Sequence, residues 1–343
     1  MRTGIVVVAP ALIVAILASA KEPPARPRSI ERDARSFATQ YRRPADIPNP
    51  AANAASPERL ALGRALFFDP RLSRSSFVSC ASCHNPAFSW ADGNARATGD
   101  SMKTLGRRTP TILNLAWADA LFWDGRAGTL EQQALGPITS AAEMNLPAER
   151  LVSRLSAVPE YVSRFKAAYP SEGITAATVG KAIAVFERSV VSGSAPFDRW
   201  VAGDARAISE DAKRGFVLFN TKARCSQCHM GWRFTDDGFQ DIGLPGEDRG
   251  RGAIVKLDET QHAFKTPTLR NVSERAPYMH DGSIATLEEV VELYDRGGEV
   301  SRPSLSDEIH PLHLTAAEKG QLLAFLRTLS SNDAAVAIPT LPR

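Results

Sequence analysis

The feature that most constrains this chain is a short pattern, Cys-x-x-Cys-His, that occurs twice. It uses every cysteine of the 343-residue chain: Cys80, Cys83 and His84 form the first copy, and Cys225, Cys228 and His229 form the second. A redox dithiol does not explain the histidine after each pair, and a structural zinc would need ligands from two distant segments. Two complete copies are typical of c-type haem attachment, in which the thiols bond to the haem and the histidine binds the iron. We therefore predict two covalently bound haem c groups.

The first 20 residues resemble an export signal. Arg2 precedes an apolar run over 5–18, and Ala18-Ser19-Ala20 forms a small-residue cleavage site. We predict a signal peptide over 1–20 and a periplasmic protein without a membrane span; an uncleaved anchor is the alternative. A formal net charge of +3, from 41 basic and 38 acidic side chains, gives no reason to expect a nucleic-acid partner.

The remaining chain predicts a mainly α-helical fold with long loops. Residues 21–50 are rich in Pro, Arg and Ala without periodicity, which favours an extended arm. Apolar periodicity predicts helices beginning after Ser56 and over 175–191, 210–220, 287–294 and 316–329. We expect an N-terminal haem domain over 51–195 and a C-terminal haem domain over 196–335.

The two halves share an internal repeat, which indicates a duplication. Thr109-Pro110-Thr111 recurs as Thr266-Pro267-Thr268, 157 positions later, and at the same spacing Asn114 recurs as Asn271, Asp124-Gly125 as Asp281-Gly282, and Thr129-Leu130-Glu131 as Thr286-Leu287-Glu288. The repeat allows one half to be compared with the other.

The sixth ligand of each iron decides between electron transfer and chemistry. Candidates in the second half are Met230, His262, Tyr278, Met279, His280, Tyr294, His310 and His313. The counterpart of Tyr294 in the first half is Pro137, which cannot bind iron. If this position faces the haem in both halves, the second iron gains a phenolate and the first stays open. A core tyrosine is the alternative.

Two side chains of the first half suit chemistry at an open haem. Glu143 follows Pro137 and could move a proton between the oxygens of bound peroxide, although most single glutamates are exposed. Trp123 could carry electrons between the haems, although most tryptophans are core residues. For Trp200 and Trp232, relay roles are possible but buried structural roles are favoured.

These motifs resemble the dihaem cytochrome c peroxidase and MauG family over about 60–329. The resemblance rests on Cys-Ala-Ser-Cys-His-Asn, Phe-Trp-Asp-Gly-Arg-Ala, Lys-Thr-Pro-Thr-Leu-Arg-Asn-Val and Pro-Tyr-Met-His-Asp-Gly-Ser. It implies that Trp123 lies between the haems and that Glu143 is the acid–base residue at the peroxide site.

Three departures from the typical peroxidases select a branch. The helix after His-Asp-Gly has no methionine ligand, and Tyr294 falls where MauG-like enzymes place a ligating tyrosine. The stretch that usually carries a capping histidine ends here in Asp100, so the resemblance implies an open N-terminal haem. A calcium-binding asparagine is replaced by Arg108, which leaves calcium only a possible cofactor, near Thr266 and Thr268.

Three functions remain open on the sequence alone. The first is a peroxide-dependent enzyme that oxidises a tryptophan or similar side chain of a partner protein through both haems, as in MauG-like and MbnH-like enzymes. The second is a peroxidase that reduces hydrogen peroxide with electrons from a small cytochrome or copper protein. The third is an electron carrier with both irons capped.

Overall fold

The computed structural model describes residues 30–333 and 335–343, and its fold is mainly helical. The predicted signal peptide lies outside these residues, and no helix within them is long and apolar enough to cross a bilayer. The α-helices are α1 Ile30–Ala38, α2 Pro57–Phe68, α3 Cys80–Cys83, α4 Leu130–Thr139, α5 Ala148–Ser156, α6 Pro159–Ala168, α7 Ala176–Arg188, α8 Pro196–Val201, α9 Glu210–Asn220, α10 Gly252–Val255, α11 Leu287–Arg296 and α12 Ala316–Arg327. Strands β1 Phe239–Gln240 and β2 Phe264–Lys265 pair antiparallel. Nine short 3₁₀ helices occur in the described loops.

The predicted helices begin at side chains that cap them. Ser56 accepts the backbone N–H of Arg59, with Pro57 in the first helical turn. Threonine or serine caps α7, α9, α11 and α12 in the same way, through Thr175, Ser209, Thr286 and Thr315. The predicted helices are therefore observed, with ends that differ by a few residues.

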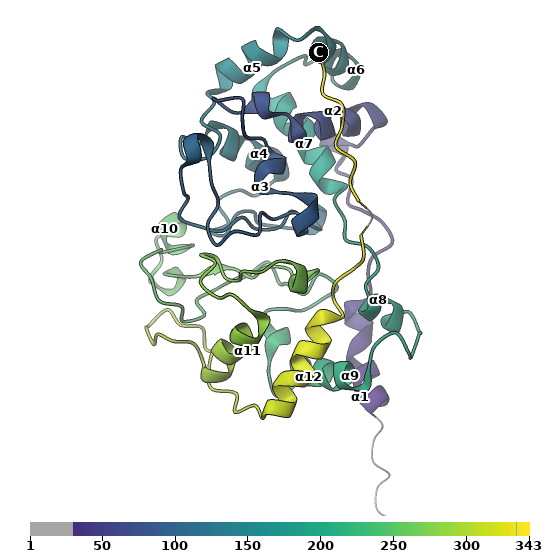
Figure 1. Cartoon of the computed structure of the whole chain (residues 1–343), viewed down its shortest axis with the longest axis vertical. Coiled ribbons are helices and arrows are strands. Elements are labelled where there is room, and N and C mark those ends of the chain that lie inside the picture. Colours follow the sequence, from purple (N-terminus) through teal and green to yellow (C-terminus); the bar gives the residue numbers. More distant parts are fainter. Residues whose placement is uncertain (1–29, 334) are drawn as a thin grey trace, which may run out of the picture.

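The helices form two lobes, seen one above the other in Figure 1. The first lobe contains α2 to α7, and its hydrophobic cluster runs from Leu62 to Val190. The second lobe contains α1 and α8 to α12, and its cluster includes Phe197, Phe216 and Phe325. The predicted domain boundary near Ala195 falls between the last residue of the first cluster and Phe197.

One close helix crossing organises each lobe. In the first lobe α2 crosses α7 at Gly63, where a Cβ atom would lie 1.9 Å from the carbonyl oxygen of Ala182. In the second lobe α9 crosses α12 at Gly215, where a Cβ atom would lie 1.9 Å from the carbonyl oxygen of Gln321. Only a residue without a side chain permits either approach.

The prediction of an extended arm over 21–50 is wrong for the described part of that segment. Residues 30–38 form α1, and Ala34, Ala38 and the following Tyr41 are buried in the second lobe. The Tyr41 hydroxyl donates to Asn220 Oδ1 at 2.7 Å. Alanines four residues apart lie on one helix face, but the many charged neighbours obscured this short stripe.

The opposite end of the chain completes the first lobe. Val336 and Leu341 pack against the cluster of that lobe. Arg71 donates to the carbonyl of Pro342 at 2.8 Å. The C-terminal segment runs along the first lobe in Figure 1, whereas α1 lies beside α9 in the second. Each lobe therefore includes residues from the far end of the chain.

The repeated asparagines make the same contact in each lobe. Asn114 holds the segment after α7: its backbone N–H donates to Val190, and its side chain accepts from the N–H of Ser192 at 3.0 Å. Asn271 holds the segment after α12 in the same way, through the carbonyl of Leu329 and the N–H of Ser331 at 3.0 Å.

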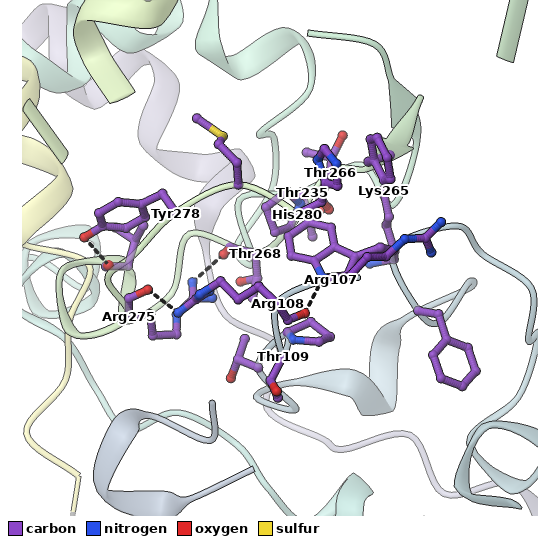
Figure 2. Close-up of a pocket in the computed structure, with 18 of the residues that line it drawn as sticks. Arg107, Arg108, Thr109, Thr235, Lys265, Thr266, Thr268, Arg275, Tyr278 and His280 are labelled. Atoms are coloured by element: carbon purple, nitrogen blue, oxygen red, sulfur yellow. Dashed lines mark hydrogen bonds between the residues drawn. The ribbon is translucent and has the colours of Figure 1, made fainter. Parts of the chain in front are cut away.

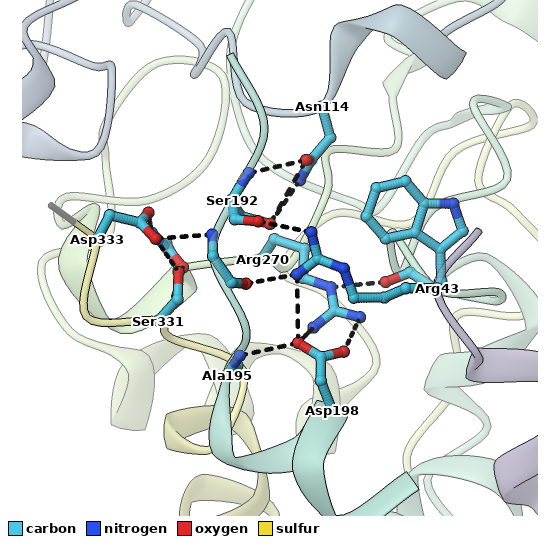
Figure 3. Close-up of polar contacts among 11 residues, drawn as sticks. Arg43, Asn114, Ser192, Ala195, Asp198, Arg270, Ser331 and Asp333 are labelled. Atoms are coloured by element: carbon cyan, nitrogen blue, oxygen red, sulfur yellow. Dashed lines mark hydrogen bonds and ion pairs between the residues drawn. The ribbon is translucent and has the colours of Figure 1, made fainter. Parts of the chain in front are cut away.

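A buried ion pair lies beside these segments. Figure 3 shows Asp198 of α8 accepting from Arg270. The nitrogen–oxygen distance of this pair is 2.9 Å, and both side chains are buried. Arg43, which follows α1, donates to the carbonyl of Ser192 at 2.5 Å. Loss of either partner would leave an uncompensated buried charge, which is strongly destabilising.

We predict that Gly63→Ala and Gly215→Ala each destabilise the protein by roughly 1–3 kcal/mol, because the added methyl group must push two helices apart. Gly320→Ala in α12 is the control, since nothing lies within 4 Å of the position that its added methyl group would take. This control should raise stability by about 0.5–1 kcal/mol. Denaturant unfolding of the haem-loaded protein measures all three, and equal effects at the three glycines would contradict the crossing argument.

Candidate haem-binding site

A single cavity of about 630 Å³ joins the two Cys-x-x-Cys-His motifs. Every residue predicted for the site lines it: Cys80, Cys83, His84, Trp123, Glu143, Cys225, Cys228, His229, Thr266, Thr268 and Tyr294. Residues far apart in sequence therefore meet around one space, lined largely by apolar side chains from both lobes.

Each motif forms a tight turn that orients its histidine. The backbone N–H of His84 donates to Cys80 at 2.8 Å, and that of His229 donates to Cys225 at 2.9 Å. The imidazole Nδ1 of His84 lies 3.2 Å from the carbonyl oxygen of Trp90, and that of His229 lies 2.9 Å from the carbonyl oxygen of Phe234. Burial lowers the pKa of both imidazoles and favours their neutral form. With Nδ1 bonded to a carbonyl, Nε2 is left to bind iron.

The residues present fit two haem groups. The four cysteines are free thiols, and among the described residues no group of three His, Cys, Asp or Glu side chains could hold a metal ion on its own. A closed zinc site therefore has no ligand set in this part of the chain. Paired thiols, an adjacent neutral imidazole and a shared apolar cavity match the requirements of haem c.

Glu143 lies at the His84 end of the cavity. Its charge is among the influences that raise the pKa of Cys80 and Cys83, with burial the largest, so the carboxylate lies near both thiols. Asp100 instead accepts a hydrogen bond from Ser75 and does not line the cavity. The aspartate is thus not positioned as a ligand.

Two further polar residues at this end were missed by sequence reasoning. Gln133 on α4 and Glu187 on α7 line the cavity, and each has a buried oxygen without a hydrogen-bond partner in the described chain, Oε1 and Oε2 respectively. Burial raises the pKa of Glu187 to about 8, which keeps it protonated at neutral pH. Nothing in the sequence marks them, because both belong to ordinary helical stretches.

Tyr294 lies at the His229 end of the cavity, on α11. Its hydroxyl makes no hydrogen bond within the described chain, and burial raises its pKa, with smaller contributions from Cys225 and Cys228. Pro137 on α4 lines the His84 end.

The other candidates for the sixth ligand differ in their hydrogen bonds and in whether they line the cavity. Tyr278 donates to the carbonyl of Val272 at 3.1 Å, and His262 Nδ1 lies 2.9 Å from the carbonyl of Asp248. Met230 is exposed and does not line the cavity, nor does His313. Met279, His280 and His310 do line it.

Trp123 lies between the two ends, held by contacts to both lobes. Its indole N–H donates to the carbonyl of Arg108 at 2.8 Å (Figure 2). Its ring meets the ring of His280 edge-on, with 6.5 Å between centroids, and His280 stacks on Phe264 at 3.5 Å. Trp200 and Trp232 do not line the cavity; Trp200 is fully buried and donates to Glu31.

The neighbourhood suggested for calcium does not fit that ion. The carbonyl of Thr268 accepts a hydrogen bond from Arg275 at 2.6 Å, and that of Thr266 accepts one from Thr235 at 2.6 Å. Calcium needs six to eight oxygen ligands, usually with carboxylates. The guanidinium of Arg108 lies beside this group instead (Figure 2).

Comparison with known proteins identifies the family of the chain. Residues 57–206 match the family model described as di-haem cytochrome c peroxidase. The chain is 52% identical over 316 residues to the methylamine utilization protein MauG of Methylorubrum extorquens, covering 91% of this chain and 89% of that protein. It is 36% identical over 287 residues to the cytochrome c551 peroxidase of Nitrosomonas europaea, covering 82% of each.

A solved structure of a related protein has a similar fold. The crystal structure of a MauG-like protein associated with microbial copper homeostasis superposes with a TM-score of 0.78 at 34% identity, covering 84% of this chain and 95% of that one. The chain therefore belongs to the dihaem cytochrome c peroxidase and MauG family. Within that family it is a peroxide-dependent dihaem oxidoreductase with the MauG-like fold.

We predict that Glu187→Gln removes part of the pH dependence of stability. The folded pKa, about 8, lies above the unfolded value of 4.5, so the contribution of this carboxyl is complete below pH 4.5 and is lost as the pH rises towards 8. Over that range its loss approaches about 1.4 kcal/mol per pH unit. Denaturant unfolding at several pH values measures it, and parallel curves for the two proteins would contradict the assigned pKa.

Proposed function

We propose that the protein is a periplasmic enzyme that uses hydrogen peroxide at the His84 haem and oxidises a tryptophan or similar side chain of a partner protein. The observation that carries the proposal is the contrast between the two ends of the cavity. One end has Tyr294, whose hydroxyl has no hydrogen-bond partner in the described chain, and the other has Pro137 with Glu143 nearby. With haem bound, the tyrosine would close one iron, and the other iron would be open to peroxide.

Each haem is proposed to be attached through its two thiols and held by its histidine. The bound haem supplies iron that can accept and release electrons. Glu143 would take a proton from one peroxide oxygen and return it to the other, so that the O–O bond breaks and the outer oxygen leaves as water, while the haems would supply the two electrons that this cleavage requires.

Tyr294 is proposed to close the second site as a phenolate. Burial raises the pKa of its phenol, so the phenolate requires a neighbouring cation, and ferric iron is such a cation. An anionic ligand favours the higher oxidation states of iron, in contrast to the thioether of a methionine. This ligand suits a site that stores oxidising equivalents rather than one that receives electrons at high potential.

Trp123 is proposed to carry electrons between the two sites. It is held by Arg108 and lies against His280, in the wall that both motifs share. The duplication of the two halves, which the repeated contacts of Asn114 and Asn271 support, explains why one scaffold presents two unequal haem sites.

The partner protein is not identified by the site. The relative at 52% identity is named for methylamine utilization, so a protein of that process is the first partner to test. The second candidate function is reduction of peroxide with electrons from a small cytochrome or copper protein, which the likeness to cytochrome c551 peroxidases favours.

One experiment distinguishes these functions. Stoichiometric peroxide is added to the diferric protein, and optical and Mössbauer spectra are recorded. We expect iron above the ferric state at both sites, persisting until a protein substrate is oxidised. Oxidation at one site only, or activity only after half-reduction with a reduced cytochrome, would support the peroxidase instead, and no reaction would support an electron carrier.

Glu143→Gln should slow the reaction with peroxide by about 100- to 10,000-fold, because the amide cannot accept the proton. Stopped-flow absorbance measures this rate. Glu149→Gln on α5 is the matched control, since Glu149 is exposed and does not line the cavity. Equal rates for the two variants would exclude the proton-transfer role.

Tyr294→His should change the optical and electron paramagnetic resonance spectra of the His229 haem and leave those of the His84 haem unchanged. Tyr278→Phe is the control, because the Tyr278 hydroxyl is bonded to the Val272 carbonyl. An unaltered His229 haem in Tyr294→His would show that this tyrosine is not the ligand.

A further inference from the structure

Two arginines in the wall of the cavity that joins the two motifs are buried without a carboxylate partner in the described chain. Arg108 is 5% exposed and Arg275 is 6% exposed, and both line the cavity. Neighbouring cationic side chains, in contrast, do have carboxylate partners. Arg107 pairs with Asp124 and Asp248, each at 2.7 Å, and Lys265 pairs with Asp237 at 2.5 Å.

The two guanidinium groups are bonded to backbone carbonyls instead. Arg108 Nη2 donates to the carbonyl of Arg275. Arg275 Nη2 donates to the carbonyls of Thr268 at 2.6 Å and Arg270 at 2.9 Å, and its Nε donates to Asn271 at 3.3 Å. Figure 2 shows Arg108, Arg275 and Thr268 converging. Carbonyl oxygens are also what calcium binds, so guanidinium N–H groups take up oxygen atoms that a cation would need.

The guanidinium groups of Arg108 and Arg275 bring positive charge into the cavity wall. Burial, and then the charge of Arg108, lowers the pKa of Arg275 to about 9, which still leaves it protonated at neutral pH. The Nε of Arg108 is buried without a hydrogen-bond partner in the described chain. Buried like charges are unfavourable unless an anion lies nearby, and haem bound in this cavity would bring carboxylates that could serve as such anions.

We propose that the Arg108–Arg275 pair replaces the calcium ion that the family resemblance implies, so that this protein joins its two haem sites without calcium. The proposal goes beyond the proposed function and does not depend on peroxide chemistry. A fixed pair of side chains supplies the charge that a dissociable ion supplies elsewhere.

Arg108 also connects the two lobes through its backbone. Its carbonyl accepts the indole N–H of Trp123 at 2.8 Å, and its N–H donates to the carbonyl of His280 at 2.8 Å. The same residue therefore carries the charge and holds the aromatic side chain between the sites. Removal of free calcium leaves this connection intact.

The first test uses the haem-loaded wild-type protein. After dialysis with millimolar calcium and then buffer, elemental analysis should find iron at two per chain and calcium well below one per chain. EGTA should alter neither the haem spectra nor the unfolding temperature. Stoichiometric calcium, or haem spectra that change with EGTA, would overturn the proposal.

The second test removes the pair. The double variant Arg108→Asn with Arg275→Ser frees the Thr268 carbonyl, adds an amide oxygen and deletes both charges. Its unfolding temperature should rise by several degrees with millimolar calcium and fall again with EGTA, and calorimetry should detect calcium binding.

The control removes two exposed arginines, Arg96→Asn with Arg206→Ser, and should not respond to calcium. A double variant at Arg108 and Arg275 that folds and ignores calcium would show that the pair does not occupy the place of a cation. A calcium response in the control would overturn the assignment in the same way. If the double variant at Arg108 and Arg275 does not fold, the calcium content of the wild-type protein and its response to EGTA test the proposal.

Discussion

The structure depends on one constraint: both Cys-x-x-Cys-His motifs open into the same cavity. Residues of both lobes line this cavity, and most of the buried apolar side chains form two large clusters, one in each lobe. Close helix crossings at Gly63 and Gly215 compact each cluster. Polar contacts also join the two lobes, such as the ion pair of Arg107 with Asp248, whose nitrogen–oxygen distance is 2.7 Å.

Within this scaffold, positions that correspond in the repeat carry different side chains. Thr129 and Thr286 cap α4 and α11 in the same way, and residues of both helices line the cavity. One of them then presents Pro137 and the other Tyr294. Gene duplication would supply the geometry once, and substitution at a few inward positions would separate a reactive site from a storage site.

Local signals in the sequence predicted much of this arrangement. Cap residues such as Ser56 and Thr286, together with apolar periodicity, predicted the main helices, and the repeat spacing alone paired Tyr294 with Pro137. All predicted cofactor residues line one cavity, although their chemical roles stay predictions. These features depend on neighbours in sequence or on strict motifs, which a single chain displays.

Features that depend on distant packing were not predictable in the same way. The stripe of Ala34 and Ala38 is too short to reveal α1, and its burial depends on α9. Gln133, Glu187 and Arg275 acquire their character from burial beside the cavity, which no local pattern records. Arg108 was recognised as a poor calcium ligand, but its bond to the Arg275 carbonyl required the three-dimensional arrangement.

The placement of the chain ends has a consequence for the order of biosynthesis. Synthesis proceeds from the N-terminus, and domains often fold as they emerge. Here α1 is made before α9, against which it packs, and Val336 and Leu341 of the first-lobe cluster are made after the second lobe. Neither lobe therefore has all of its packing partners until segments of both lobes have been synthesised.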